Sequence, residues 1–186
     1  MSERDTGPIR RFRLGPRFEF INTVAITAAT TLEVTALEVG YDYIFQLENF
    51  KNTGDDETLW MRFSDDGGAT YEAGASDYAW GLTANGTQSE DDADAQIDLT
   101  VLLGNDTGNR NTVEITLVNP NSAGETTAHW VGFFMNAAAT PLIRSMNGGA
   151  LFEQGPGVVD AVQFLWSGGS VFTAIGSITV WRRNRV

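Results

Sequence analysis

The segment Ser64-Asp-Asp-Gly-Gly-Ala-Thr-Tyr71 combines hydroxyl, carboxylate and glycine residues at the spacing of a tight turn. Asp66 is placed to accept hydrogen bonds from turn amides, and Gly68 is suited to a positive φ. An aromatic residue that closes such a corner can plug the core beneath it. The pattern therefore predicts a structural hairpin corner without a catalytic role, built from Ser64, Asp66, Gly68, Thr70 and Tyr71.

The same spacing, S-x-D-x-G-x-T-aromatic, resembles the Asp-box of sialidase-like propellers. Those proteins carry several boxes around a propeller, whereas this chain has one box in 186 residues and is too short for a full propeller. Its body arginines Arg62, Arg110 and Arg144 are scattered in an acidic sequence, which is weak support for a triad that binds a carboxylate sugar. Sialidase activity is therefore disfavoured.

Other catalytic signatures are also missing from the sequence. It has no cysteine, which excludes disulfides, cysteine-ligated zinc and thiol catalysis. Its one histidine, His129, has no G-x-S-x-G nucleophile motif for which it could act as the base, and phosphate-binding glycine loops are absent. We therefore expect a protein that is not an enzyme. A glycosidase with paired carboxylates stays open, because the distance between carboxylates cannot be read from the sequence.

Runs of acidic residues supply oxygen ligands of the kind that calcium prefers. They lie at 55–57, 65–66 and 90–94. An EF-hand loop starting at Asp92 would need glycine at its sixth position, where the chain has Ile97. We predict no cofactor and no resident metal, with calcium held by a loop as the alternative.

Charge is divided unevenly along the chain. The net charge is −12, yet the body from Phe18 to Trp181 holds four basic residues against 22 acidic ones, a formal charge of −18. Such a body repels nucleic acid, so no nucleic-acid partner is expected. The remaining basic residues lie at the two ends, and we expect them to dock on an acidic partner, unless they are only solvated tails. The candidate docking residues are Arg10, Arg11, Arg13, Arg17, Arg182, Arg183 and Arg185.

The length favours one domain, with a basic N-terminal arm over residues 1–17 and a folded domain over 18–186. No run of 18 apolar residues occurs, so no membrane helix is expected. The N-terminus has charges and prolines where a signal peptide needs an apolar segment. We therefore expect synthesis in the cytoplasm.

From Phe18 onward the pattern is that of short β-strands separated by turn residues. Leu32-Glu-Val34 and Val113-Glu-Ile115-Thr-Leu117 alternate apolar and polar side chains, as strands with one buried face do. We predict strands at 18–27, 31–39, 42–50, 58–64, 77–82, 97–103, 112–118, 127–135, 158–166 and 177–182. Residues 83–96 are predicted to form a long acidic loop, and Asn147-Gly148-Gly149 a turn. This spacing is typical of an all-β antiparallel sandwich.

Aromatic residues are the remaining candidates for binding. Trp80 and Trp130 are candidate glycan-stacking platforms of the kind seen in carbohydrate-binding sandwiches. The alternative for each is packing in the core, where large aromatic residues of a β-sandwich usually lie.

Several segments read in order resemble a family of structural proteins of tailed phages and prophages, of the tail-fibre or head-decoration type. They are 42–50, 59–71, 78–80, 118–122, 162–169 and 176–181, with Leu59-Trp-Met-Arg-Phe-Ser-Asp-Asp-Gly-Gly68 as the most specific run. The resemblance covers residues 32–181, and the basic end at 182–186 departs from it. It implies a jelly-roll-like sandwich that oligomerises, as a trimer or larger, on the surface of the virion.

We therefore expect an exterior virion protein, as a head decoration or a tail or neck component. It would assemble with other virion proteins through its basic arm and through contacts between subunits. The alternative is a carbohydrate-binding module that recognises a host receptor from the phage tail.

Overall fold

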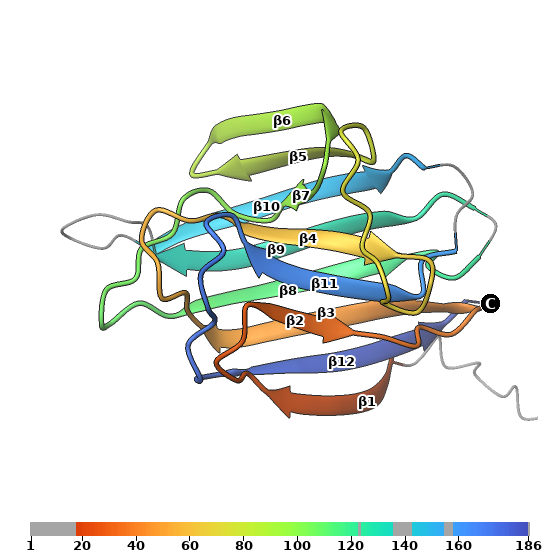
Figure 1. Cartoon of the computed structure of the whole chain (residues 1–186), viewed down its shortest axis with the longest axis horizontal. Helices are drawn as coiled ribbons and strands as arrows, with labels where there is room; N and C mark the ends of the chain where they lie inside the picture. Colours follow the sequence, from red (N-terminus) through yellow and green to blue (C-terminus); the bar gives the residue numbers. More distant parts are fainter. Residues whose placement is uncertain (1–17, 123, 136–142, 155–157, 186) are drawn as a thin grey trace, which may run out of the picture.

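The computed structural model describes residues 18–122, 124–135, 143–154 and 158–185. These residues form twelve strands and no helix, arranged in two antiparallel sheets (Figure 1). The prediction of an all-β antiparallel sandwich is confirmed, whereas its jelly-roll winding stays a prediction. Among the described residues, no helix is long and apolar enough to cross a membrane. The basic arm, 1–17, lies outside the described residues.

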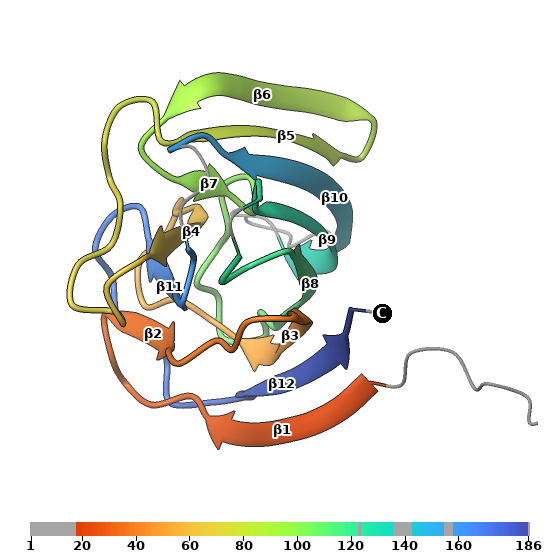
Figure 2. The ribbon, with the colours of Figure 1, turned by 90° about the vertical axis from the view of Figure 1, so that its right-hand side faces the viewer.

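The larger sheet has eight strands in the order β1-β12-β3-β8-β9-β10-β5-β6. Their bounds are β1 Phe18–Ala25, β3 Tyr41–Phe50, β5 Tyr78–Ala84, β6 Thr87–Asp94, β8 Asn111–Val118, β9 Thr127–Met135, β10 Ile143–Phe152 and β12 Ser177–Asn184. The smaller sheet has the order β2-β11-β4-β7, with β2 Thr31–Val34, β4 Leu59–Ser64, β7 Ile97–Asp98 and β11 Ala161–Trp166. The larger sheet curves around the smaller one, so that its outer side is convex (Figure 2).

The core lies between the two sheets. In β8, Val113, Ile115 and Leu117 are fully buried and alternate with polar residues on the other side of the strand, as the sequence predicts. Aromatic pairs join the sheets: Phe45 of β3 contacts Phe164 of β11 with ring centroids 6.0 Å apart. Each such ring removes a large apolar area from water, which is the main term that holds the sheets together.

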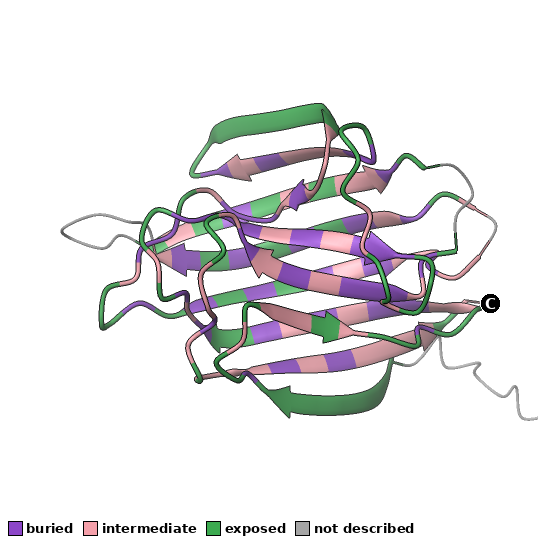
Figure 3. Cartoon of the chain, in the orientation of Figure 1, coloured by how far each residue is buried: buried purple, intermediate pink, exposed green. Residues whose placement is uncertain are grey.

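The expected acidic loop at 83–96 is wrong, because the chain forms a hairpin there. β5 and β6 pair in an antiparallel register and turn at Asn85-Gly86, where φ is 48° and 83°. Asn-Gly with two positive φ values is the preferred two-residue hairpin turn. β6 is exposed along nearly its whole length, as is β1 at the opposite edge (Figure 3).

The expected turn at Asn147-Gly148-Gly149 is also wrong, because these residues lie in the middle of β10. Gly148 is opposite Trp130 of β9 in the register, and a Cβ added at Gly148 would lie 2.2 Å from the Trp130 ring. The glycine is therefore required to make room for the buried indole. Four other predicted strands are shorter by two or more residues in the structure: β1 ends at Ala25, β2 ends at Val34, β7 ends at Asp98 and β11 begins at Ala161.

Candidate functional site

The outer face of the eight-stranded sheet is the candidate functional site. The smaller sheet covers the inner face, and no described residue covers the outer one. Large apolar side chains stand exposed on it, with exposed fractions of 52% for Phe20, 53% for Val131 and 61% for Phe133. Gathered apolar groups on the surface of a soluble protein usually mark an interaction site. We call this surface the outer face.

An aromatic cluster occupies the outer face near the β1 edge. The rings of Phe20 and Trp181 meet edge to face, with centroids 5.3 Å apart. Trp181 lies opposite Ile44 in the β12–β3 register, and its indole nitrogen donates to Gln46 Oε1 at 3.0 Å. These contacts fix the indole on the surface of the sheet, where its ring is only partly shielded from water.

A second apolar area lies over β8 and β9. Val131 and Phe133 border a small hollow of about 270 Å³, together with Gln46, Glu48, Thr112, Val113, Glu114 and Gly132. Glu114 is tied down by Gln46, whose side-chain amide donates to Glu114 Oε2 at 2.8 Å. The two apolar areas therefore adjoin across β3 and β8, with Gln46 bonded to a residue in each.

A wider hollow of about 710 Å³ lies on the outer face near the β6 edge. Gly81 of β5 and Gly149 of β10 face each other in the register, so no side chain stands above the backbone at this point. The hollow is bordered by Ala79, Trp80, Gly81, Gly149, Ala150 and Leu151, and on the β6 side by Glu90, Asp91 and Asp92. We call it the glycine hollow. Its floor is backbone and small apolar groups, and one rim is acidic.

The two tryptophans predicted as glycan platforms do not stand on this surface. Trp130 is 3% exposed and packs in the core, so its assignment as a stacking platform is wrong. Trp80 alternates with Ala79 and Gly81 along β5, which points its side chain to the same side as the buried Tyr78. Its indole nitrogen donates to Asp94 Oδ2 at 3.0 Å. Trp80 is among the residues that border the glycine hollow, and Trp130 is not.

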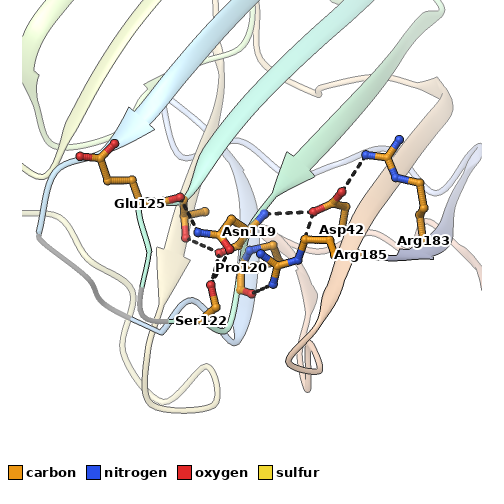
Figure 4. A network of polar contacts seen from close by, with 8 residues as sticks. Asp42, Asn119, Pro120, Ser122, Glu125, Arg183 and Arg185 are labelled. Atoms are coloured by element: carbon orange, nitrogen blue, oxygen red, sulfur yellow. Dashed lines mark hydrogen bonds and ion pairs between the residues drawn. The ribbon is translucent and has the colours of Figure 1, made fainter. Parts of the chain in front are cut away.

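The C-terminal arginines predicted to dock on a partner form ion pairs within the chain. Arg183 Nη2 lies 2.7 Å from Asp42 Oδ2, and Arg185 Nε forms a longer ion pair, 3.6 Å, with Asp42 Oδ1 (Figure 4). The backbone amide of Asn119 also donates to Asp42 Oδ1, at 3.2 Å. Asp42 is 4% exposed, and a carboxylate at that depth needs such partners.

Arg182 is held in the same way. It makes ion pairs of 2.8 Å with Glu19 and 2.6 Å with Glu38, and its guanidinium lies 4.3 Å from the centre of the Tyr41 ring. The hydrogen bond and charge of Arg182 lower the pKa of Glu19. Arg182 and Arg183 therefore fasten β12 to β1 and β3, and their docking on a partner stays a prediction. Arg10, Arg11, Arg13 and Arg17 lie outside the described residues.

The segment 64–71 is a compact corner. Asp66 Oδ1 accepts from Ser64 Oγ at 2.8 Å and from the Thr70 amide at 2.9 Å, while its Oδ2 accepts from Thr70 Oγ1 at 2.7 Å. These bonds lower the pKa of Asp66 to about 2. Gly68 has a φ of 88° and donates its amide to Ser64 Oγ.

Two tyrosines lie at or near this corner. Tyr71 is half-buried, a Cβ added at Gly68 would lie 3.0 Å from its hydroxyl oxygen, and burial raises its pKa to about 12. Tyr78 of β5 is fully buried, and its hydroxyl accepts from the Phe63 amide at 2.8 Å and donates to the Glu72 carbonyl at 3.1 Å. Tyr78 therefore joins the corner strand β4 to the loop that follows the corner.

One carboxylate that the sequence did not single out lies in a poor environment for charge. Asp98 of β7 lies opposite Trp60 in the β4 register, and its Oδ1 is buried without a hydrogen-bond partner. Burial, followed by the charge of Asp94, raises its pKa to about 7. Within the part of the chain that the structure describes, no three acidic or histidine side chains gather closely enough to hold a metal ion.

His129 stands exposed on the outer face, between Thr116 of β8 and Gly149 of β10 in the sheet register. The sequence carries a pattern from which the exposed apolar residues of the outer face could have been predicted. Phe20 belongs to the run Phe18-Glu-Phe20, and Phe133 belongs to Val131-Gly-Phe133, so apolar residues recur at every second position on a face that the other sheet does not cover.

No family model matches the chain, and no curated protein matches its sequence.

Proposed function

We propose that this chain is a structural subunit of a tailed-phage virion, placed on the particle exterior, and that it assembles through the outer face of its eight-stranded sheet. The observation that carries the assembly part is the exposure of Phe20, Val131 and Phe133 on that face. The virion part rests on the resemblance of residues 32–181 to phage structural proteins.

The occupant of the outer face, in this proposal, is a second copy of the chain. A body with a formal charge of −18 repels its own copies wherever carboxylates are dense. One row across the outer face has none: the register sets Ile44, Thr116 and His129 side by side across β3, β8 and β9. Contact there removes apolar surface from water at the lowest electrostatic cost.

The shape of the face also favours assembly over catalysis. It is a broad strand surface whose two hollows are open, rather than a deep cleft that encloses a small molecule. The carbohydrate-binding alternative loses its named residues, because Trp130 is buried and Trp80 points away from the outer face.

Sedimentation velocity on the full chain tests this proposal. We expect the wild type to form a complex larger than its 20.2 kDa monomer, and the variant Phe20→Ser/Phe133→Ser to be monomeric at the same concentration. Val39→Ser is the matched control, because Val39 is 67% exposed but lies in the turn before β3, away from the outer face. The control variant should assemble as the wild type does.

The virion part needs a separate measurement. Mass spectrometry of purified particles released from producing cells should find the wild-type chain at a fixed copy number and the double variant at a greatly reduced one. A wild-type chain that is monomeric at every concentration and absent from particles would overturn the proposal.

A further inference from the structure

The residues that border the glycine hollow favour a partner with both apolar and cationic side chains. Its floor is made by Gly81, Gly149 and Ala150, with Leu151 and Ala79 beside them, so it presents backbone and small apolar groups. Its β6 rim carries Glu90, Asp91 and Asp92, all exposed. Among the described residues, no ion pair reaches these three carboxylates. An extended segment with apolar and cationic side chains would fit both parts.

Such a segment exists in this chain, in the residues that precede β1. The run Ile9-Arg-Arg-Phe-Arg-Leu14 places three arginines among three large apolar residues. The whole arm, 1–17, has five arginines against two acidic residues. The arm is therefore the main concentration of positive charge outside the Asp42 and Glu19 ion pairs, and the β6 rim is a concentration of negative charge that lacks a described counter-ion.

Arg13 of the arm cannot reach the hollow of its own chain. The strand order puts β10 and β5 five and six interstrand spacings from β1, about 24–29 Å along the sheet. Arg13 lies five residues before Phe18, a stretch that spans at most about 18 Å when fully extended. The sheet is convex on this side, so a path over the surface is no shorter than the sheet itself (Figure 2).

We propose that the N-terminal arm of one copy docks in the glycine hollow of a neighbouring copy, with Arg11 and Arg13 paired to the acidic rim formed by Glu90 and Asp92. The contact joins the β1 side of one subunit to the β6 side of the next. It is therefore heterologous, and repetition of it produces a ring or a filament. The inference rests on the proposed function, because it names the partner segment for the same outer face.

Charge reversal in the full chain tests this contact. The arm variant is Arg11→Glu/Arg13→Glu, and the rim variant is Glu90→Lys/Asp92→Lys. We expect each to raise the apparent dissociation constant of assembly at least tenfold at low salt, measured by sedimentation velocity. Combining both reversals in one chain restores opposite charges between neighbours, so the combined variant should return to within about threefold of the wild type.

The matched control is Glu125→Lys/Glu153→Lys, which makes the same change in net charge at two exposed carboxylates outside the hollow. It should leave assembly within about threefold of the wild type. If the control weakens assembly as much as the rim variant does, net charge explains the effect and the inference fails. It also fails if the combined variant assembles no better than the arm variant.

A label experiment separates docking between copies from docking within one chain. Arg13→Lys keeps the charge and allows a carbodiimide to join its amine to Glu90 or Asp92 as an amide, with loss of water. In an equal mixture of ¹⁴N and ¹⁵N chains, half of the cross-linked peptide pairs should carry mixed labels. Pairs with a single label only, or no cross-link to the rim, would overturn the inference. The outer-face proposal would still stand in those cases if Phe20→Ser/Phe133→Ser abolishes assembly.

Discussion

Arg183 of β12 lies directly opposite Asp42 of β3, and their charged groups meet at 2.7 Å where the carboxylate is almost fully buried. Loss of the guanidinium leaves Asp42 with the Asn119 amide and the longer Arg185 contact. We expect Arg183→Gln to lower the free energy of unfolding by about 1–2 kcal/mol, less than for a fully buried pair because Arg183 is partly exposed. Urea unfolding at neutral pH measures this change.

The Asp42→Asn/Arg183→Gln double variant supplies the control for that prediction. Without the carboxylate, the arginine has no buried charge to neutralise, so the loss in the double variant should be smaller than the sum of the two single losses. Losses that simply add would mean that the two side chains act independently.

The corner at 64–71 should weaken in acid. The hydrogen bonds from Thr70 and Ser64 hold the pKa of Asp66 at about 2, below its ordinary value, so its contribution to stability is present above about pH 4 and is lost as the pH falls toward 2. We expect Asp66→Asn to lower the melting temperature at pH 7 and to make no difference near pH 2. A difference that persists at pH 2 would show that the charge of Asp66 does not matter.

Asp98 should have the opposite pH dependence. Its pKa of about 7 in the folded state lies above its ordinary value, so the folded chain keeps a proton that the unfolded chain releases between about pH 4 and pH 7. Stability from this group is therefore full at pH 4 and lost as the pH rises through 7. We expect Asp98→Asn to match the wild type at pH 4 and to exceed it by about 1–2 kcal/mol at pH 8, since partial exposure reduces the full effect.

Unfolding curves of both proteins across that range check the Asp98 prediction. Equal stabilities at pH 8 would show that the side chain ionises without penalty. The comparison is well matched, because an asparagine oxygen can still accept the hydrogen bond that the Trp60 side chain gives to Asp98.

Two neighbouring glycines in β10 should respond differently to alanine. A Cβ at Gly148 would lie 2.2 Å from the Trp130 ring and 2.7 Å from the Gly81 carbonyl oxygen, whereas a Cβ at Gly149 meets nothing closer than 3.7 Å. We expect Gly148→Ala to cost about 1–3 kcal/mol through overpacking. Gly149→Ala should be neutral or stabilising by up to about 1 kcal/mol, because alanine lowers the entropy of the unfolded chain. Thermal unfolding of the two variants tests this prediction. Equal losses of stability in both would contradict the requirement for glycine at position 148.

Those glycines also show where the sequence was a poor guide. β3 and β8 were predicted correctly, because their alternating side chains are buried on one side only. β10 was missed, because glycine there makes space for the Trp130 ring of a neighbouring strand, and that need appears only once the register is known. β6 was missed, because an edge strand can lack a buried side and so carries no apolar alternation.

The candidate site was hidden from the sequence for a related reason. Phe133 and Phe134 are consecutive aromatic residues, and one is 61% exposed while the other is fully buried. Which of them faces inward follows from the pairing of β9 with its neighbours, and a shift of one residue would exchange them. The ion pairs of the C-terminal arginines could not be predicted for the same reason, since Asp42 and Glu19 are far from them in sequence and adjacent only in the sheet.

The position of β12 also has a consequence for the order of events during synthesis. β12 lies between β1 and β3, so the first strand of the sheet has no pairing partner until the last one has left the ribosome. Pairings between distant parts of a chain form slowly, and their unpaired edges are exposed to wrong partners meanwhile. β1, the strand from which the arm extends, is thus paired only after β12 has been made. A product truncated before β12 would leave β1 without its partner strand.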